Sequence, residues 1–372
     1  MQLNIRTMPF QAKGDEVTDD TAAFQQALDL LAHQSGIIEI PEGRYKITAP
    51  LNYTGTNSIS LQLRGHSSKE SRLIWLGPAG QTLFNAHGMN TSTFENVHFE
   101  GRNQPLYVLH LQSNQAAGGS GSSNLVFNRC TIEGWSGLGS AGVAVGNTSE
   151  SFQVSELSFV NCEFGTSTAF INSGACFVFL GNPGNQKDAS FWGGSMNGCD
   201  YGIDGLINSG RIRVDGVIFS NIKIACIRNG TGTLAITGCQ AETNFDNARF
   251  VTGVGGSSNN PGCIYLAGNQ FNGQSPTGAA VVVDHYGAIN LTANQFFMGP
   301  TATPMIQTDP TFGSIASLGN VYDQTSPGAV FIDYSQNVIT NTSIISSYHD
   351  MGRNAGTMSR FPIRGTSGGF VP

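Results

Sequence analysis

The stretch LSFVNCEFG, residues 157–165, decides the fold. Apolar residues fall on alternate positions before Asn161, and the alternation resumes out of step on Cys162 and Phe164. A period of two residues is typical of a β-strand, and asparagine tolerates the left-handed backbone conformation that most residues avoid. Asn161 therefore predicts a corner between two short strands, both of which keep their apolar side chains on the inner side.

The same phase change recurs along the chain at spacings of 22 to 33 residues, which lie in the period range of solenoid proteins. Seven of the nine residues at this position are glycine or asparagine, which favours one left-handed residue in every turn. We expect these corner residues to stack in a column. They are Asn96, Arg129, Asn161, Gly193, Gly216, Gly238, Gly268, Ala293 and Gly319.

The residue after each corner is expected to point into the core. In the last three repeats it is Asn269, Asn294 or Asn320, and buried amides in register can satisfy one another along the axis. A third strand lies between consecutive corners, for example at 142–146 and 280–284. The pattern predicts parallel sheets wound into a β solenoid.

A helix is expected to cover the first coil, because the open end of a solenoid would expose core and unpaired backbone. Residues 18–36 have the pattern of such a helix, with Thr18, Asp19 or Asp20 as the N-cap and Gly36 as the stop. Capping of this helix also explains Asp15, Asp19 and Asp20 better than a functional carboxylate cluster does.

The chain is expected to divide into three parts. An N-terminal segment with the capping helix occupies 1–35, and the β-helix occupies 36–343. The repeat is lost after Ser343, so 344–372 is predicted to be an irregular C-terminal tail that covers the last coil or contacts another subunit.

The composition narrows the class of function. The net charge of −7 without Lys/Arg clusters argues against nucleic acid and acidic membranes as partners, although local arginines could hold an anionic glycan. No run of 18 apolar residues is present, and MQLNIRTMPF lacks the apolar core of a signal peptide. Seven cysteines without a CxxC pair predict buried free thiols. No metal-spaced cluster or nucleophile elbow stands out, so no metal and no cofactor are predicted.

The segments AKGDEVTDDTAAFQQALD (12–29) and GIIEIPEGRYKIT (36–48) resemble the opening of the pectate-lyase-like right-handed parallel β-helix superfamily, especially the form found in phage tailspikes and polysaccharide depolymerases. The motifs cover 10–77, and the coil pattern extends to about 343. The resemblance implies an all-β fold, a single-stranded right-handed parallel β-helix with an N-terminal capping α-helix. It also implies a glycan-handling homotrimer that is extracellular or virion-associated.

The chain departs from the family pattern in two respects. Glu16 stands where the family usually has glycine, which we interpret as a structural change. The paired-aspartate and Gly-His-Gly motifs of polygalacturonases and the acidic calcium cluster of pectate lyases are missing from the sequence, so pectin chemistry is not implied.

Neighbouring coils of a β-helix lie about 4.8 Å apart, so outward carboxylates in successive coils approach the spacing that glycosidases use. The first candidate row begins with Asp204 and Arg228 and continues near Val251 to Asp284. An acid beside arginine could bind an anionic sugar or act as the base of an elimination. The alternative is an ordinary cross-strand ion pair.

A second candidate group joins Glu163, Trp192, Arg213 and Asp215 near the corners of consecutive coils. The row of Trp192 predicts exposure, which suits a sugar-stacking platform unless a loop covers the ring. Glu242 could reach Asp215 or Asp204 around a corner.

Glu100 and Glu133 share a third row, with Trp135 close behind, and adjacent carboxylates suit an acid and nucleophile pair. Solvated acids at strand ends are the alternative. The turn 284–286 (Asp-His-Tyr) and the pair His349 and Asp350 offer acid–base groups, but sequential residues of a strand face opposite sides, which favours surface loops.

The resulting hypothesis is a carbohydrate-active protein that cleaves a bacterial-surface or other acidic polysaccharide, with hydrolysis slightly preferred to elimination. Asp204, Asp215, Glu242 and Glu163 are the predicted catalytic carboxylates, and Arg228, Arg213 and Trp192 are the predicted substrate-binding residues. A non-catalytic glycan-binding or structural trimeric spike module is the alternative, and a transferase or epimerase on the same scaffold is a third.

Overall fold

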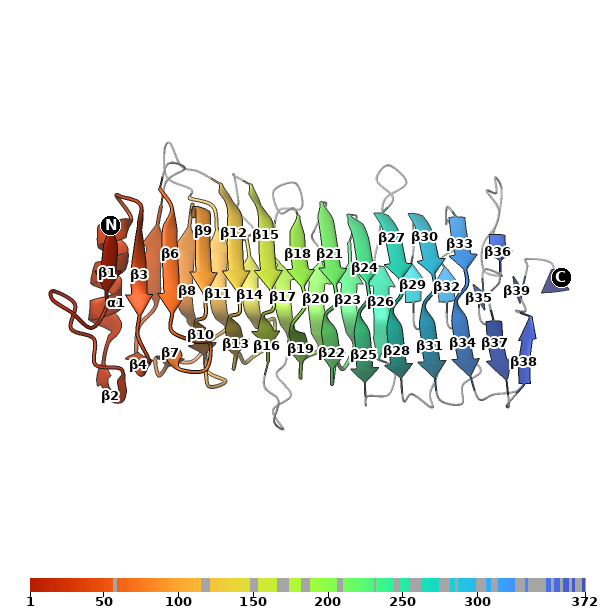
Figure 1. The fold of residues 1–372 in the computed structure, drawn as a ribbon, viewed down its shortest axis with the longest axis horizontal. Coiled ribbons are helices and arrows are strands. Elements are labelled where there is room, and N and C mark those ends of the chain that lie inside the picture. The colour runs from red at the N-terminus through yellow and green to blue at the C-terminus, as the bar shows by residue number, and fades with distance from the viewer. Residues whose placement is uncertain are drawn as a thin grey trace. The chain divides into compact units, whose positions relative to one another are not determined.

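The computed structural model describes most of the chain in detail, and the statements below concern that part. It comprises residues 1–55, 59–114, 121–147, 153–165, 174–181, 188–205, 210–230, 232–243, 248–253, 262–273, 282–284, 287–298, 306–308, 314–324, 332–333, 346–348, 351–354, 357–360, 363–364 and 370–371. These residues form two compact units, Met1–Cys199 and Asp200–Pro372, which we describe separately. Figure 1 shows the ribbon, in which short arrows recur in the same order in every coil.

The strands of the N-terminal unit form three parallel ladders, and each ladder takes at most one strand from each coil. The first ladder contains β1 (Gln2–Asn4), β3 (Gly36–Ile40), β6 (Leu61–Gly65), β9 (Asn90–Glu95), β12 (Ser122–Asn128), β15 (Val154–Val160) and β18 (Ala189–Trp192). The second contains β2 (Asp15–Asp19), β4 (Gly43–Ile47), β7 (Ser71–Trp75), β10 (His98–Glu100), β13 (Thr131–Glu133), β16 (Glu163–Phe164) and β19 (Ser195–Asn197). The third contains β5 (Leu51–Thr54), β8 (Thr82–His87), β11 (Tyr107–Gln112), β14 (Ala141–Val145) and β17 (Ala175–Phe179).

The C-terminal unit repeats this arrangement. Its first ladder contains β21 (Arg211–Asp215), β24 (Thr233–Thr237), β27 (Gly262–Ala267), β30 (Gly287–Thr292), β33 (Ser314–Leu318) and β36 (Ser346–Tyr348). Its second contains β22 (Ile218–Ser220), β25 (Gln240–Thr243), β28 (Gln270–Gly273), β31 (Gln295–Met298), β34 (Val321–Gln324), β37 (Met351–Asn354) and β38 (Thr357–Arg360). Its third contains β20 (Tyr201–Gly205), β23 (Ala225–Asn229), β26 (Arg249–Gly253), β29 (Val282–Asp284), β32 (Ile306–Thr308), β35 (Ile332–Asp333), β39 (Ile363–Arg364) and β40 (Phe370–Val371). The predicted parallel β-helix is therefore confirmed.

The corner prediction is also confirmed. All nine corner residues have positive φ angles, between 49° at Asn161 and 65° at Gly319. The residue after each corner is buried wherever it carries a side chain, from Val97 to Asn320. One left-handed residue per coil thus redirects the chain while apolar side chains of both flanking strands stay inside.

The predicted asparagine ladder exists in the C-terminal unit. Asn269 Nδ2 donates to Asn294 Oδ1, and Asn294 Nδ2 donates to Asn320 Oδ1, both at 2.9 Å. The same amide oxygens accept the backbone N–H groups of Asn269 and Asn294, and each Nδ2 also donates to a carbonyl of the preceding coil. Burial of these polar groups is tolerated because their hydrogen bonds are made within the core.

The cysteines are free thiols, as predicted. Six are buried, and Cys263 is half-buried. Cys130 and Cys162 follow corners, and their thiols donate to the carbonyls of Phe94 and Phe127 at 3.4 Å.

Helix α1 (Thr21–Leu31) covers the first coil with Phe24, Ala27, Leu28 and Leu31 buried, as expected of a cap. Asp20 occupies the N-cap position, but its carboxylate accepts the N–H groups of Lys13 and Gly14 instead of capping the helix. Burial raises the pKa of this carboxyl group. Within the described residues, no helix is long and apolar enough to cross a membrane.

The segment predicted to be an irregular tail contains strands. β36 and β37 extend two ladders in parallel, and the last strands, β38 and β40, pair antiparallel with β37 and β39. The sequence pattern missed these strands because SSY and MGRN lack the alternation of apolar residues that marks the earlier coils. The boundaries at 35 and 343 stay predictions.

Candidate functional site

A charged surface of the N-terminal unit lies on the outer face of its second ladder. In β4, β7, β10 and β13 the central residue points inward and is fully buried, and the residues on either side of it point outward. Cross-strand register therefore creates outward rows. One row contains Arg44, Arg72 and His98, and the other contains Lys46, Ile74, Glu100 and Glu133.

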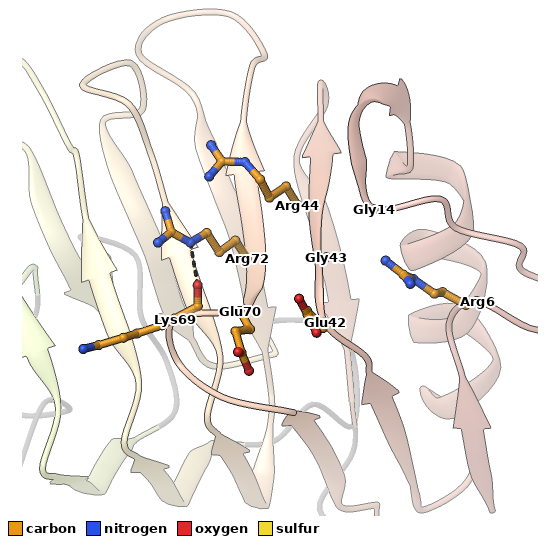
Figure 2. Close-up of a pocket in the computed structure, with 8 residues that line it drawn as sticks. All are labelled: Arg6, Gly14, Glu42, Gly43, Arg44, Lys69, Glu70 and Arg72. Carbon is orange, nitrogen blue, oxygen red and sulfur yellow. Dashed lines mark hydrogen bonds between the residues drawn. The ribbon is translucent and has the colours of Figure 1, made fainter.

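A pocket of about 490 Å³ opens at the first coils of this face, and we call it the cationic pocket. Four of the chain's 18 Lys and Arg residues line it, together with two glutamates, although the whole chain is acidic. Figure 2 shows side chains from several consecutive segments around it. The lining residues are Arg6, Gly14, Glu42, Gly43, Arg44, Lys69, Glu70 and Arg72.

Arg6 is fixed in the pocket by Tyr45. Its Nε donates to the hydroxyl oxygen of Tyr45 at 3.1 Å, and its guanidinium carbon lies 5.6 Å from the centroid of the Tyr45 ring. A Cβ atom added at Gly14 would come within 2.7 Å of Arg6 Nη2. The glycine therefore leaves the space that the guanidinium occupies. Among the residues that the structure describes, no carboxylate pairs with Arg6, so a cation is held at the pocket wall.

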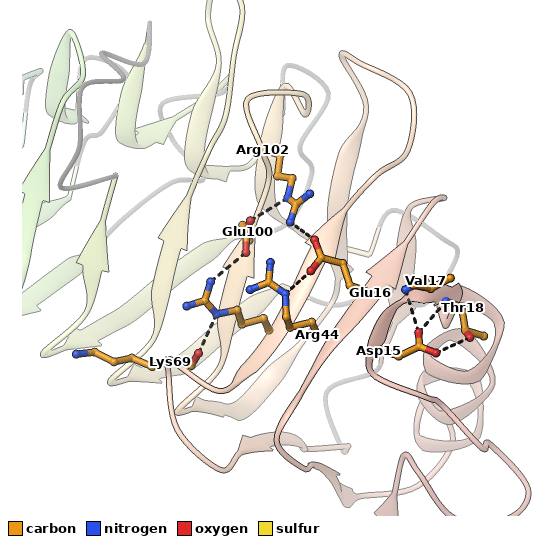
Figure 3. Close-up of polar contacts among 9 residues, drawn as sticks. Asp15, Glu16, Val17, Thr18, Arg44, Lys69, Glu100 and Arg102 are labelled. Atoms are coloured by element: carbon orange, nitrogen blue, oxygen red, sulfur yellow. Dashed lines mark hydrogen bonds and ion pairs between the residues drawn. The ribbon is translucent and has the colours of Figure 1, made fainter.

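Arg72 links the pocket to a network of ion pairs. Its Nε donates to the carbonyl of Lys69 at 2.8 Å, and its Nη1 lies 3.4 Å from Glu100 Oε2. Glu100 also pairs with Arg102 through Oε1 at 2.9 Å. Figure 3 shows the chain of contacts continuing from Arg102 to Glu16 and Arg44.

Glu16 joins this network from a left-handed backbone position. Its φ angle is 64°, a conformation that glycine adopts at lower cost. Its carboxylate accepts from both Arg44 and Arg102, and the hydrogen bond from Arg44 is the main reason that the pKa of Glu16 is lowered. The substitution of the family's glycine thus adds side-chain contacts between coils.

Glu42 and Glu70 are the carboxylates of the pocket. Each directly precedes one of two cross-strand partners, Gly43 of β4 and Ser71 of β7, and the Gly43 N–H donates to the carbonyl of Glu70 at 2.8 Å. Both residues are exposed. Their place in successive coils brings the two backbones to the ladder spacing of about 4.8 Å.

A second cluster, the His98–Glu100–Glu133 cluster, lies beside the pocket. Glu100 and Glu133 are cross-strand partners, as predicted, and one ligand atom from each of the three side chains lies within 4.8 Å of the other two. His98 is only 5% exposed, and its Nε2 lies 3.0 Å from Glu133 Oε1. Trp135 is fully buried.

The structure brings Asp204 and Arg228 together as predicted. Arg228 Nε donates to Asp204 Oδ1 at 2.8 Å, and Nη2 contacts Oδ2, so the ion pair is bidentate. The guanidinium carbon also lies 4.3 Å from the centroid of the Tyr201 ring. The row continues at Thr252, next to Val251 as predicted, but its last member is wrong by one residue, because Thr252 is opposite Val283 and not Asp284.

The other predicted catalytic residues of the C-terminal unit lie on different ladders from Asp204. Asp215 is on β21, with Arg213 Nη2 at 3.9 Å from its Oδ2, and Glu242 is on β25 between Ser220 and Asn272. The hydrogen bond recorded for the Glu242 carboxylate comes from Gln240 of its own strand. Asp204 belongs to the third ladder, so these three acids do not share an outward row.

Glu163 and Trp192 lie in the N-terminal unit. Glu163 is exposed on β16 opposite Thr131 and Ser195, and Trp192 is half-exposed at the end of β18. The turn at 284–286 is described only for the backbone of Asp284, and the pair at 349–350 lies outside the described residues.

Little in the sequence pattern indicates the cationic pocket. Arg6, Lys69 and Glu70 lie outside the repeating corner motif, so the stacking pattern places none of them. The signal that could have found part of it is the register of Arg44 and Arg72, which follows from aligning the buried Tyr45 and Leu73.

Comparisons with known proteins agree with the fold. Residues 4–74 match the family model described as rhamnogalacturonase A/epimerase, pectate lyase-like. A search of curated proteins gives no match. The resemblance to the pectate-lyase-like parallel β-helix superfamily, which the opening motifs indicated, is thus confirmed.

Three solved structures share the fold at low sequence identity. Geobacillus virus E2 ORF18 is 12% identical with a TM-score of 0.54, and the match covers 95% of this chain and 61% of that one. The Acinetobacter phage vB_ApiP_P1 tailspike protein is 14% identical with a TM-score of 0.53, covering 98% and 61%. DFA-IIIase from Arthrobacter chlorophenolicus A6, solved in complex with GF2, is 10% identical with a TM-score of 0.53, covering 95% and 93%. This chain therefore spans less than two thirds of the two viral proteins.

Proposed function

We propose that the chain is a carbohydrate-active β-helix protein that binds an acidic polysaccharide in the cationic pocket and cleaves it. The observation that carries this proposal is the gathering of four cationic side chains around one pocket of an acidic chain. Guanidinium groups bind carboxylate, sulfate or phosphate groups of sugars through charge-assisted hydrogen bonds. The tailspike and DFA-IIIase structures support the fold of such a protein, and the substrate is inferred from the pocket.

Hydrolysis is preferred to elimination because the pocket offers two carboxylates in successive coils. Glu42 and Glu70 are placed for a pair in which one carboxyl group protonates the leaving oxygen and the other attacks the sugar or activates water. Elimination would need one base and a cation that stabilises the developing charge, and Arg44 or Arg72 would serve there.

The binding step is tested with a panel of acidic and neutral polysaccharides. Removal of one charged contact costs about 1.5–3 kcal/mol, so Arg6→Gln and Lys69→Gln should weaken binding of an acidic polysaccharide roughly tenfold or more. Arg129→Gln is the matched control, because Arg129 is an exposed arginine that pairs with Glu95 away from the pocket. Equal affinity in all four proteins, or binding of neutral polysaccharides alone, contradicts the proposal.

The cleavage step is tested with Glu42→Gln and Glu70→Gln. Loss of a general acid or base lowers the rate by about 10²–10⁴-fold, while binding should persist. New reducing ends without an unsaturated sugar product indicate hydrolysis, and the ultraviolet absorbance of that product indicates elimination. Loss of activity in Asp204→Asn, Asp215→Asn, Glu242→Gln or Glu163→Gln, with the pocket variants active, would move the chemistry to the carboxylates predicted from the sequence.

A non-catalytic glycan-binding module is the second candidate. It is favoured by the excess of cations over acids in the pocket and by the exposure of both glutamates. Tight binding without reducing ends or unsaturated products would select it. The homotrimer and the extracellular or virion-associated location belong to the proposal as well, and light scattering of the purified chain tests the trimer.

A further inference from the structure

His98 is a buried side chain of the N-terminal unit whose polar atoms are unsatisfied. It lies on the outer face of β10 but is 5% exposed, and neither ring nitrogen has a hydrogen-bond partner of adequate geometry. A buried polar group without a partner costs about 1–3 kcal/mol. Its Nε2 faces Glu133 Oε1 at 3.0 Å, so the nitrogen is directed at a carboxylate.

The surrounding carboxylates differ in their partners. Glu100 accepts from Arg72 and Arg102, which balance its charge. Glu133 has no lysine or arginine partner among the described residues, and its carboxylate is 21% exposed. The His98–Glu133 pair therefore places an imidazole nitrogen and a carboxylate oxygen side by side, and both atoms can ligate a cation.

We propose that His98, Glu100 and Glu133 bind one divalent transition-metal ion, for which Zn²⁺ is best suited. The inference does not depend on glycan binding in the cationic pocket. One imidazole with carboxylates suits zinc, whereas calcium and magnesium prefer oxygen ligands alone. The ion would join β10 to β13 and so fasten two successive coils.

The distances allow this arrangement after a small adjustment. An ion about 2.1 Å from each donor keeps the donors about 3–3.5 Å apart. The His98 and Glu133 atoms already have that separation, and all three ligand atoms lie within 4.8 Å of one another. A rotation of the Glu100 carboxylate, which stays in contact with Arg102, would complete the set.

Calorimetric titration of the full chain with Zn²⁺, Mn²⁺ and Ca²⁺ tests the site. We expect one Zn²⁺ per chain and a loss of affinity of about tenfold or more in His98→Gln and in Glu133→Gln. His66→Gln is the matched control, because His66 and Glu70 form an exposed pair at 3.6 Å that could bind zinc adventitiously. Unchanged affinity in both cluster variants, or a loss only in the His66 variant, overturns the proposal.

A measurement on the wild-type chain covers the case in which a variant fails to fold. Hydrogen exchange with and without Zn²⁺ should show slower exchange in β10 and β13. Absence of zinc binding, or protection confined to other strands, refutes the site. Failure of glycan binding would leave this result unaffected, because the readout is the metal alone.

Discussion

Two residues before each corner, the N-terminal unit carries a column of aromatic rings, whereas the C-terminal unit carries aliphatic side chains at four corners and the buried Ser317 at the fifth. Phe94, Phe127, Phe159 and Phe191 stack with centroid distances of 4.4, 4.7 and 5.0 Å. The corresponding residues of the other unit are Val214, Ile236, Leu266 and Leu291, all buried. The same backbone corner thus accommodates either kind of core.

The residues after the corners differ in a compensating way. Cys130 and Cys162 make weak thiol hydrogen bonds to carbonyls of the preceding coil, and Asn269 and Asn294 direct amides to the same position. The C-terminal unit therefore combines an aliphatic column with a ladder of strong amide hydrogen bonds. The N-terminal unit combines stacked rings with weak thiol hydrogen bonds. The comparison suggests that each unit concentrates its stabilisation in a different column.

The largest expected effect comes from breaking the aromatic column. Phe127→Ala should lower the free energy of unfolding by about 3–5 kcal/mol, because a fully buried ring between two stacked rings is removed. Urea unfolding measures the loss, and Ile236→Val in the aliphatic column is the control, with an expected cost of about 0.5–1.5 kcal/mol. Equal losses of unfolding free energy in the two variants would show that the stacked rings stabilise their unit no more than the aliphatic column does.

The second effect concerns the amide ladder. Asn294→Ala should cost about 2–4 kcal/mol, since it leaves the backbone and side-chain donors of Asn269 and the carbonyl of Leu266 without their partners. Asn272→Ala, an exposed neighbour on β28, should change stability by less than about 0.5 kcal/mol. If Asn294→Ala were as mild as Asn272→Ala, the ladder would not stabilise the unit.

Acid should destabilise the N-terminal unit more than the asparagine ladder of the C-terminal unit. Burial lowers the pKa of His110 to about 4, from 6.5, so the folded N-terminal unit resists a proton that the unfolded chain accepts. Stability is therefore complete above about pH 6.5 and falls by about 1–3 kcal/mol as the pH drops toward 4. The asparagine ladder has no titrating group in this range.

Hydrogen exchange at pH 7 and pH 4.5 measures this difference strand by strand. After correction for the slower intrinsic exchange of amides in acid, we expect lower protection factors in β11 and β14 at pH 4.5 than at pH 7, with little change in β27 and β30. His110→Gln keeps a donor for the carbonyl of Gly146 and should remove the part of the pH dependence that comes from His110, while the half-buried His87 keeps its own part. If acid lowered the protection of β11 and β14 as much in His110→Gln as in the wild type, the assignment to His110 would be contradicted.

The smallest effect compares two replacements of Glu16. Both Glu16→Gly and Glu16→Ala remove the contacts with Arg44 and Arg102, which cost little at a half-exposed site. Only alanine keeps the penalty of a positive φ angle, so the glycine variant should be more stable by about 1 kcal/mol. Thermal unfolding of the two proteins decides the point, and equal stability would argue against left-handed strain at this position.

The fold could be predicted because its determinants are local and periodic. Seven of the nine corner residues are glycine or asparagine, which tolerate the positive φ angles that all nine adopt, and the spacing of the asparagines placed their amides in register. The cross-strand register of the third ladder was harder to predict from the sequence than that of the ladders beside the corners. The step from Thr252 to Val283 was missed by one residue, because no corner residue fixes the alternation there.

The site was predictable only where it followed the repeat. The alignment of Phe99 with Ile132 placed Glu100 opposite Glu133, but it could not show that His98 is buried or that Arg72 and Arg102 both contact Glu100. Those facts depend on the paths of connections between coils and on long side chains. The cationic pocket likewise depends on Arg6, which reaches Tyr45 from outside the ladder.

The most direct test of the functional account maps where a glycan touches the chain. Hydrogen exchange of the wild-type protein should be measured with and without the acidic polysaccharide that binds best. The account predicts slower exchange in β4, β7 and residues 66–70 of the N-terminal unit, which surround the cationic pocket. Protection confined to β20, β23 and β26, around Asp204 and Arg228, would contradict it.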